Sequence, residues 1–161
     1  MKKIPLSKGL FALVDDEDYK ELSKSKWYAS VKSNGTAYAV RNRCSYDGKK
    51  GLIQMHRIVT GNIEGLLVDH INGDSLDNRR ENLRICTNSE NLMNRGPQKD
   101  NSTGFKGVCF HRQRQKYKAE IKKDGVKKYL GLFACPIEAA KAYDKAAAEL
   151  HGGFAHLNFP A

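Results

Sequence analysis

The stretch Val68-Asp69-His70-Ile71-Asn72-Gly73-Asp74 lies between two short apolar runs near the middle of this 161-residue chain. Residues 66–68 open it, and residues 83–87 follow it with the alternation of a strand. A Thr-x-x-Glu capping box then predicts a short helix over residues 89–95. Strand, polar loop, strand and helix would bring four polar residues toward one place: Asp69, His70, Asn82 and Asn91.

These residue types suit the hydrolysis of a phosphodiester. Asp69 and Asn91 offer hard oxygen ligands for Mg²⁺, an ion that keeps several waters and takes further ligands from substrate phosphate. An imidazole can take a proton from the attacking water near neutral pH, and His70 is the nearby candidate. The plain alternative is a polar turn, because Asn, Gly and Asp are common turn residues. A calcium loop is excluded, since Asp74 stands where its glycine must be.

Residues 65–95 resemble the HNH endonucleases of the ββα-metal class, in particular the phage-type and homing enzymes. The resemblance implies that Asp69 and Asn91 hold the metal. It also implies that His70 is the general base and that Asn82 orients His70 through a hydrogen bond. Asn91 occupies the position of the histidine that ends the family name. This substitution favours Mg²⁺ or Mn²⁺ over Zn²⁺ as the cofactor.

The last third of the chain carries a second pattern. Strand signals at residues 104–108, 116–121 and 127–133, with a turn at Asp124-Gly125, predict a three-stranded antiparallel sheet. Pro136 and the helical spacing from Ile137 to Leu150 predict one α-helix packed on one face of that sheet. The other face is expected to be basic and to enter the major groove of DNA. Its expected contacts are Lys106, His111, Arg112, Arg114, Lys116, Lys118, Lys122, Lys127, Lys128 and Tyr129.

Residues 104–160 resemble the plant ethylene-response-factor, or Apetala-type, DNA-binding domain. The matching segments are Gly107-Val108, Ala119-Glu120-Ile121, Tyr129-Leu130-Gly131 with Phe133, Glu138-Ala139-Ala140 with Ala142-Tyr143-Asp144, and Leu157-Asn158-Phe159-Pro160. The family commonly has Arg and Trp on the strands, where this chain has lysines, Cys109, His111 and Tyr129. We therefore expect the fold to carry over better than the target sequence, with more of the affinity coming from phosphates.

Composition and charge set the expected domain organisation. The net charge is +10, and from Arg95 onward 13 Lys and Arg stand against 6 Asp and Glu, which predicts a polyanionic partner for that part. The interpretation is an α+β protein with a nuclease domain over residues 1–95, a linker over 96–102 and a DNA-binding domain over 103–161. The N-terminal part is a β-rich lead-in with strands expected at residues 10–14, 27–31 and 37–41. His56 is open to a structural role, a DNA contact or support of the metal site.

Cysteines and apolar runs indicate the compartment. Cys44, Cys86, Cys109 and Cys135 form no Cys-x-x-Cys pair, so we expect reduced thiols and no structural zinc. The sequence has neither an apolar signal core nor a run that could span a bilayer, which predicts a cytoplasmic protein of a phage or its bacterial host.

Together these patterns predict an HNH homing-type endonuclease that cuts double-stranded DNA as a monomer or homodimer. A separate groove-binding module would position the phosphate that a one-metal site hydrolyses. The alternative is a sequence-specific DNA-binding regulator with an inactive nuclease fold, disfavoured because all four site residues are present. An RNA-binding protein is weaker still, because the aromatic stacking signature of common RNA modules is missing.

Overall fold

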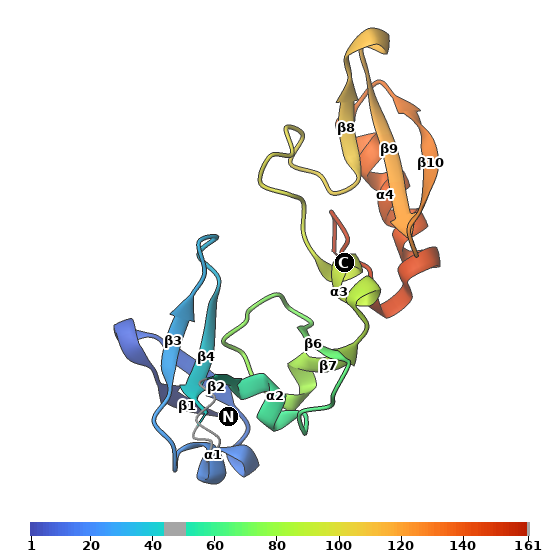
Figure 1. Ribbon diagram of the computed structural model, residues 1–161. Helices are drawn as coiled ribbons and strands as arrows, with labels where there is room; N and C mark the ends of the chain where they lie inside the picture. Colours follow the sequence, from blue (N-terminus) through green and yellow to red (C-terminus); the bar gives the residue numbers. More distant parts are fainter. Residues whose placement is uncertain (44–50, 161) are drawn as a thin grey trace. The chain divides into compact units, whose positions relative to one another are not determined.

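The computed structural model describes residues 1–43 and 51–160. The chain forms two compact units, Met1–Thr87 and Asn88–Ala161, and each is described by itself (Figure 1). In the described residues four α-helices accompany several small antiparallel sheets, which agrees with the expected α+β class. None of the helices in this part of the chain is both long and apolar enough to cross a membrane.

The first unit opens with two antiparallel sheets. One contains β1 and β2, and the other has the strand order β3-β4-β5. An Asn34-Gly35 turn joins β3 to β4: Gly35 has φ of 89°, and its amide donates to the carbonyl of Lys32 at 2.9 Å. The elements are β1 (Lys2–Pro5), β2 (Phe11–Val14), α1 (Asp16–Leu22), β3 (Tyr28–Val31), β4 (Ala37–Asn42), β5 (Leu52–Gln54) and α2 (Met55–Val59).

One hydrophobic core joins this lead-in to the predicted nuclease segment. Its buried side chains come from β1, β2, α1, β4, α2 and the strand that begins at Leu83. Trp27 lies in this core, and its indole N–H donates to the carbonyl of Leu22 at 2.8 Å. Burial of such side chains stabilises the unit by roughly 1.5–3 kcal/mol each. The nuclease segment therefore depends on the N-terminal residues for its own core.

Two short strands carry the central motif. β6 (Leu67–His70) and β7 (Leu83–Cys86) pair antiparallel, with His70 opposite Leu83. The loop between them ends in a 3₁₀ turn over Arg80–Asn82 and is held by β2. The amide of Leu13 donates to the carbonyl of Leu76 at 2.9 Å, and the amide of Asn78 donates to the carbonyl of Leu13 at 2.8 Å. The lead-in thus fixes the loop that follows His70.

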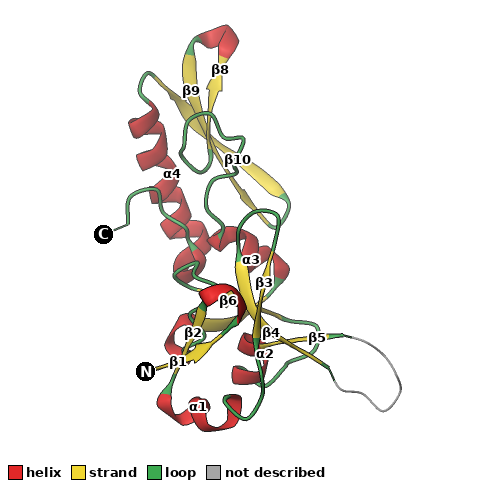
Figure 2. Cartoon of the chain, turned by 90° about the vertical axis from the view of Figure 1, so that its left-hand side faces the viewer, coloured by secondary structure: helices red, strands yellow, loops and turns green. Residues whose placement is uncertain are grey.

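The second unit contains an antiparallel sheet of order β10-β9-β8 with α4 along one face (Figure 2). Asp124 and Gly125 have φ of 48° and 84°, as a two-residue turn with both residues at positive φ requires. The elements are α3 (Asn88–Asn94), β8 (Val108–His111), β9 (Lys116–Lys123), β10 (Val126–Phe133) and α4 (Pro136–His151), with 3₁₀ turns at Arg112–Arg114 and Gly152–Phe154.

Small residues let α4 approach its sheet closely. Ala139, Ala140 and Ala147 are fully buried against it. Gly107 has φ of 75°, and a Cβ there would lie only 2.0 Å from Cδ2 of Tyr143. Glycine is therefore required at this position both for its backbone conformation and for the space that the tyrosine ring occupies.

Residues 96–102, expected as a linker, lie inside the second unit. The side chain of Asn101 accepts from the amides of Thr103 and Gly104 at 2.8 and 3.1 Å and donates to the carbonyl of Phe105 at 2.8 Å. These bonds fold the polar segment into an ordered turn. The boundary between the units falls earlier, after Thr87, because α3 packs with the C-terminal segment of the second unit.

Three of the cysteines are free thiols in the structure. Cys86 is buried, Cys135 is half-buried and Cys109 is exposed. Cys44 lies outside the described residues.

Candidate active site

Asp69 and His70 occupy the end of β6, and both are only 7% exposed. The strand register places Arg84 directly opposite Asp69 on the same face of the ladder. Nε and Nη2 of Arg84 both donate to Oδ2 of Asp69, at 2.9 and 2.7 Å. This charge-assisted pair fixes the carboxylate and offsets the cost of burying its charge.

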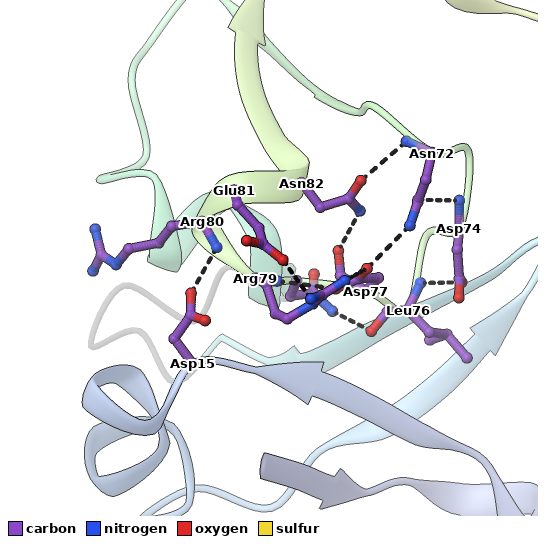
Figure 3. A network of polar contacts seen from close by, with 10 residues as sticks. Asp15, Asn72, Asp74, Leu76, Asp77, Arg79, Arg80, Glu81 and Asn82 are labelled. Atoms are coloured by element: carbon purple, nitrogen blue, oxygen red, sulfur yellow. Dashed lines mark hydrogen bonds and ion pairs between the residues drawn. The ribbon is translucent and has the colours of Figure 1, made fainter. Parts of the chain in front are cut away.

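Asn82 anchors the loop that leaves His70. Its Oδ1 accepts from the amide of Asn72 at 3.0 Å, and its Nδ2 donates to the carbonyl of Asp77 at 2.8 Å (Figure 3). Its own carbonyl accepts from the amide of Ile71 at 2.9 Å. The family resemblance implies a direct hydrogen bond from Asn82 to His70, and the side-chain bonds described here for Asn82 go to the loop backbone. Asn82 thus fixes the backbone that follows His70.

Asn78 is a buried amide whose side chain influences the imidazole. It is 1% exposed, its Nδ2 donates to the carbonyl of Leu76 at 3.0 Å, and its side chain opposes the effect of burial on the pKa of His70. Sequence spacing alone assigns Asn78 no role. Its position depends on the bond from its amide to Leu13, which is 65 residues away along the chain. Local sequence carries no signal for that contact.

An ion-paired network stiffens the same loop. Oδ1 and Oδ2 of Asp77 accept from Nε and Nη2 of Arg79 at 2.8 and 2.7 Å, and Asn72 also donates to Oδ2. Arg80 joins the loop to α1 through ion pairs with Glu17 and Asp18. Asp77 is thereby engaged by the loop itself, and the arginine holds the pKa of its carboxyl below the usual value. The network gives the site a fixed frame.

Two aromatic rings pack against the His70 imidazole. The ring of His56 lies 5.1 Å from it, centroid to centroid, at 88°, and Tyr38 lies 6.3 Å from His70 and 5.8 Å from His56. Such edge-to-face contacts restrict the orientation of each ring. Sequence reasoning left His56 undecided and missed Tyr38, because the hairpin that carries Tyr38 is brought to the site only by the fold.

Burial controls the protonation of both histidines. It is the main reason that the pKa of His56 falls to about 3, with smaller contributions from the charges of His70, Arg57 and Lys32. Burial also lowers the pKa of His70, against the opposing effects of Asn78 and nearby carboxylates. Both imidazoles are therefore neutral at pH 7, which is the form that a general base needs.

The expected metal ligands lie on different elements. Asp69 is the penultimate residue of β6, whereas Asn91 is a half-buried residue of α3 and belongs to the second unit. Among the described residues, no group of three or more His, Cys, Asp or Glu side chains could hold a metal ion. One carboxylate with one amide oxygen fits Mg²⁺, which keeps several waters, better than an ion that needs a closed protein cage.

Comparison with known proteins decides the family. Residues 55–93 match the HNH endonuclease family. A protein of Acanthamoeba polyphaga mimivirus, named an uncharacterized HNH endonuclease, is 35% identical over 157 residues, which make up 94% of this chain and 76% of that protein. This chain belongs to the HNH endonuclease family.

Two further proteins are similar to parts of the HNH endonuclease chain. Protein 3.8 of Escherichia phage T7 is 29% identical over 113 residues, or 70% of this chain and 93% of the phage protein. The AP2-like ethylene-responsive transcription factor TOE2 of Arabidopsis thaliana is 38% identical over 65 residues. That match covers 40% of this chain but only 13% of the plant protein.

The sheet of the endonuclease's second unit has one face that α4 does not cover. Ala119 and Ile121 of β9 are buried against the helix, so the alternate residues of β9 point the other way. Residues directly opposite in the register share a face, which adds residues of β8 and β10. The residues of this uncovered face, defined here as the free face, include His111, Lys116, Lys118, Glu120, Lys122, Lys127 and Tyr129.

Four of the ten expected DNA contacts lie outside the free face. Lys128 pairs with Ile121 in the register and therefore lies on the helix side, since adjacent strand residues point to opposite faces. Lys106 precedes β8 and is half-buried, and its ammonium donates to the carbonyl of Met93 near the end of α3. Burial lowers the pKa of Lys106 to about 8. Arg112 and Arg114 are exposed on the 3₁₀ turn after β8.

An acidic residue sits among the lysines of the free face. Glu120 forms ion pairs with Nζ of Lys118 at 2.8 Å and Nζ of Lys127 at 3.3 Å. The pKa of its carboxyl is held below the usual value by these contacts, led by the hydrogen bond from Lys118. The charge of the free face is therefore lower than its count of lysines indicates, and Lys116 and Lys122 are its exposed cations beside this trio.

Proposed function

We propose that this member of the HNH family is a metal-dependent endonuclease that hydrolyses phosphodiester bonds in double-stranded DNA. The observation that carries the proposal is the neutral, fixed imidazole of His70 beside the buried carboxylate of Asp69. A nucleophilic water needs a base held near the phosphate, and a hard metal ion needs an anionic oxygen ligand next to it. Both groups stand at adjacent positions on β6.

His70 acts as the general base in this mechanism. Its neutral imidazole accepts a proton from water as the water oxygen bonds to phosphorus and the bond from phosphorus to the leaving oxygen breaks. Asn78, His56 and Tyr38 hold the ring in one orientation, and Asn82 holds the peptide that follows it. This preorganisation reduces the entropy that must be lost when the reacting groups align.

Asp69 and Asn91 are the proposed ligands of Mg²⁺ or Mn²⁺. The bound ion would stabilise the negative charge that develops on the phosphate oxygens. The Arg84 guanidinium donates to Oδ2 of Asp69 and so fixes the orientation of the carboxylate. Carboxylates that bind metals are commonly held by hydrogen bonds in this way. One such site cuts one strand in each binding event, so a monomer would nick DNA and a symmetric homodimer could cut both strands.

The free face of the second unit is the proposed DNA-binding surface. Support comes from its exposed cations, the adjoining Arg112 and Arg114, and the partial similarity to the AP2-like plant protein. Tyr129 is 60% exposed on this face and is the proposed contact to a sugar or base. Lysines bind phosphates as point charges, so this surface contributes affinity more than sequence choice.

The proposed DNA-binding surface has a matched test within the same unit. The double variant Lys116→Gln/Lys122→Gln should reduce the slope of log affinity against log salt by about 1.8. Lys141→Gln/Lys145→Gln removes two exposed charges from α4 and should leave the slope unchanged. An equal reduction of the slope in the two double variants would exclude a special role for the free face in DNA binding.

The nuclease activity is tested with supercoiled plasmid. Addition of Mg²⁺ or Mn²⁺ to chelator-treated protein should convert the plasmid to nicked circles or linear DNA, and excess chelator should stop the conversion. Circular dichroism should remain unchanged by the chelator, because the core of each unit is made of side chains rather than metal ligands. The alternative, a DNA-binding regulator with an inactive nuclease fold, predicts binding without any conversion.

A further inference from the structure

The β3–β4 hairpin carries an exposed lysine at its tip. The amide of Lys32 donates to the carbonyl of Thr36 at 2.9 Å, and the carbonyl of Lys32 accepts from Gly35 at 2.9 Å. These bonds close a fixed turn, so the backbone that carries the lysine is ordered. The side chain of Lys32 is exposed.

The lysine lies over a ring of the active-site cluster. Its Nζ is 4.6 Å from the centroid of the Tyr38 ring. That same ring contacts both imidazoles, at 5.8 Å from His56 and 6.3 Å from His70. A cation over an aromatic face is attracted by the negative potential of the ring. The hairpin thus holds one ammonium group over the ring that packs against the proposed general base.

The charge of Lys32 reaches the His56 imidazole. It is one of the causes of the low pKa of His56, after burial and the charges of His70 and Arg57. In the described part of the chain, no carboxylate lies within ion-pair distance of this ammonium. By contrast, Lys24 in the same unit is paired with Glu21. Lys32 therefore presents a charge that the described residues of this unit do not neutralise through an ion pair.

Arg41, which is on β4 with Tyr38, contacts residues on the opposite face of the sheet. Tyr38 and Arg41 are three residues apart on β4, so their side chains point to opposite sides of the sheet. Nη1 of Arg41 donates to Oγ of Ser25 at 2.6 Å, and its guanidinium lies 5.5 Å from the ring centroid of Trp27. Arg41 thus supports the core behind the sheet, whereas Lys32 accompanies the ring that faces His70.

We propose that Lys32 binds a backbone phosphate of the DNA strand engaged at His70, which makes the β3–β4 hairpin the phosphate-binding arm of the first unit. The choice of DNA as the ligand rests on the proposed function. An ammonium on a flexible stem is a suitable point-charge ligand for phosphate. Its support by Tyr38 reduces the side-chain entropy lost on binding. The arm would hold the strand close to the imidazole while the free face of the second unit makes its own contacts.

The test measures binding rather than cleavage. Full-length wild-type protein, Lys32→Met and Lys32→Arg are titrated into a fluorescent DNA duplex, with chelator present, over a series of salt concentrations. Lys20→Met is the matched control, because Lys20 is an exposed lysine on α1, at the end of the first unit away from the hairpin tip (Figure 1). Trp27 fluorescence verifies that each variant keeps the folded core.

Lys32→Met should reduce the slope of log affinity against log salt by about 0.9, the value for one lost phosphate contact. Lys32→Arg should restore the slope, and Lys20→Met should leave it unchanged. The proposal is overturned if Lys32→Met keeps the wild-type slope or if Lys20→Met loses as much. If Lys32→Met lowers the slope but the wild-type protein does not cut plasmid, the phosphate contact stands and the nuclease function is rejected. Failure of the phosphate contact and failure of the proposed function are therefore distinguishable.

Discussion

His56 should make the first unit sensitive to acid. It is 5% exposed, and burial lowers its pKa from 6.5 to about 3. Below pH 6.5 the unfolded chain binds a proton at this imidazole, whereas the folded chain stays neutral until about pH 3. Because the pKa of His56 is lower in the folded state, the unfolding free energy is unaffected by this group above pH 6.5 and falls as the pH drops below that value. The loss is about 1.4 kcal/mol per pH unit, or roughly 2 kcal/mol between pH 6.5 and 5.

Urea unfolding followed by Trp27 fluorescence measures this effect, because the single tryptophan lies in the core of the first unit. His56→Phe keeps an aromatic ring and should flatten the dependence of the unfolding free energy on pH by the amount calculated above. His151→Gln, in the second unit, is the control and should leave the Trp27 curve unchanged. Curves for wild type and His56→Phe that run parallel from pH 7 to 5 would refute the assigned burial of a neutral imidazole.

Three further changes test separate parts of the structure. Gly107→Ala should lower the unfolding free energy of the second unit by at least about 3 kcal/mol, seen by thermal circular dichroism, because its Cβ would overlap the Tyr143 ring. Asn78→Ala should slow single-turnover cleavage by about 10- to 100-fold without changing DNA affinity, since it supports the base. Asp69→Ala should raise the Mg²⁺ concentration for half-maximal cleavage about tenfold or more, and an unchanged value would exclude it as a ligand.

Local sequence patterns gave the elements of the site but not their contacts. β6, β7 and α3 begin and end within one or two residues of expectation, because alternation and capping are properties of neighbouring residues. Asn78, Tyr38 and the packing of His56 depend on strands that are distant in the sequence. Such contacts leave no periodic signal, so a single sequence could not assign their roles.

The second unit shows the same division. The alternation of β9, the turn at Asp124-Gly125 and the spacing of α4 are local, and all three agree with the structure. The number of lysines, however, does not show which face of the sheet each one occupies. Successive strand residues point to opposite faces, so Lys127 and Lys128 lie on opposite sides of the sheet. Lys106 is half-buried, and its ammonium donates to the carbonyl of Met93 in α3, a contact that composition does not indicate.

Single-turnover cleavage of plasmid DNA by His70→Ala tests the central claim most directly. With Mg²⁺ and saturating protein, the variant should cut at least about 100-fold more slowly than wild type, because the general base is removed. Its DNA affinity, measured with chelator, should match that of wild type, since the proposed phosphate contacts of Lys32 and the free face remain. Cleavage by His70→Ala at the wild-type rate would contradict the assignment of His70 as the base of this endonuclease.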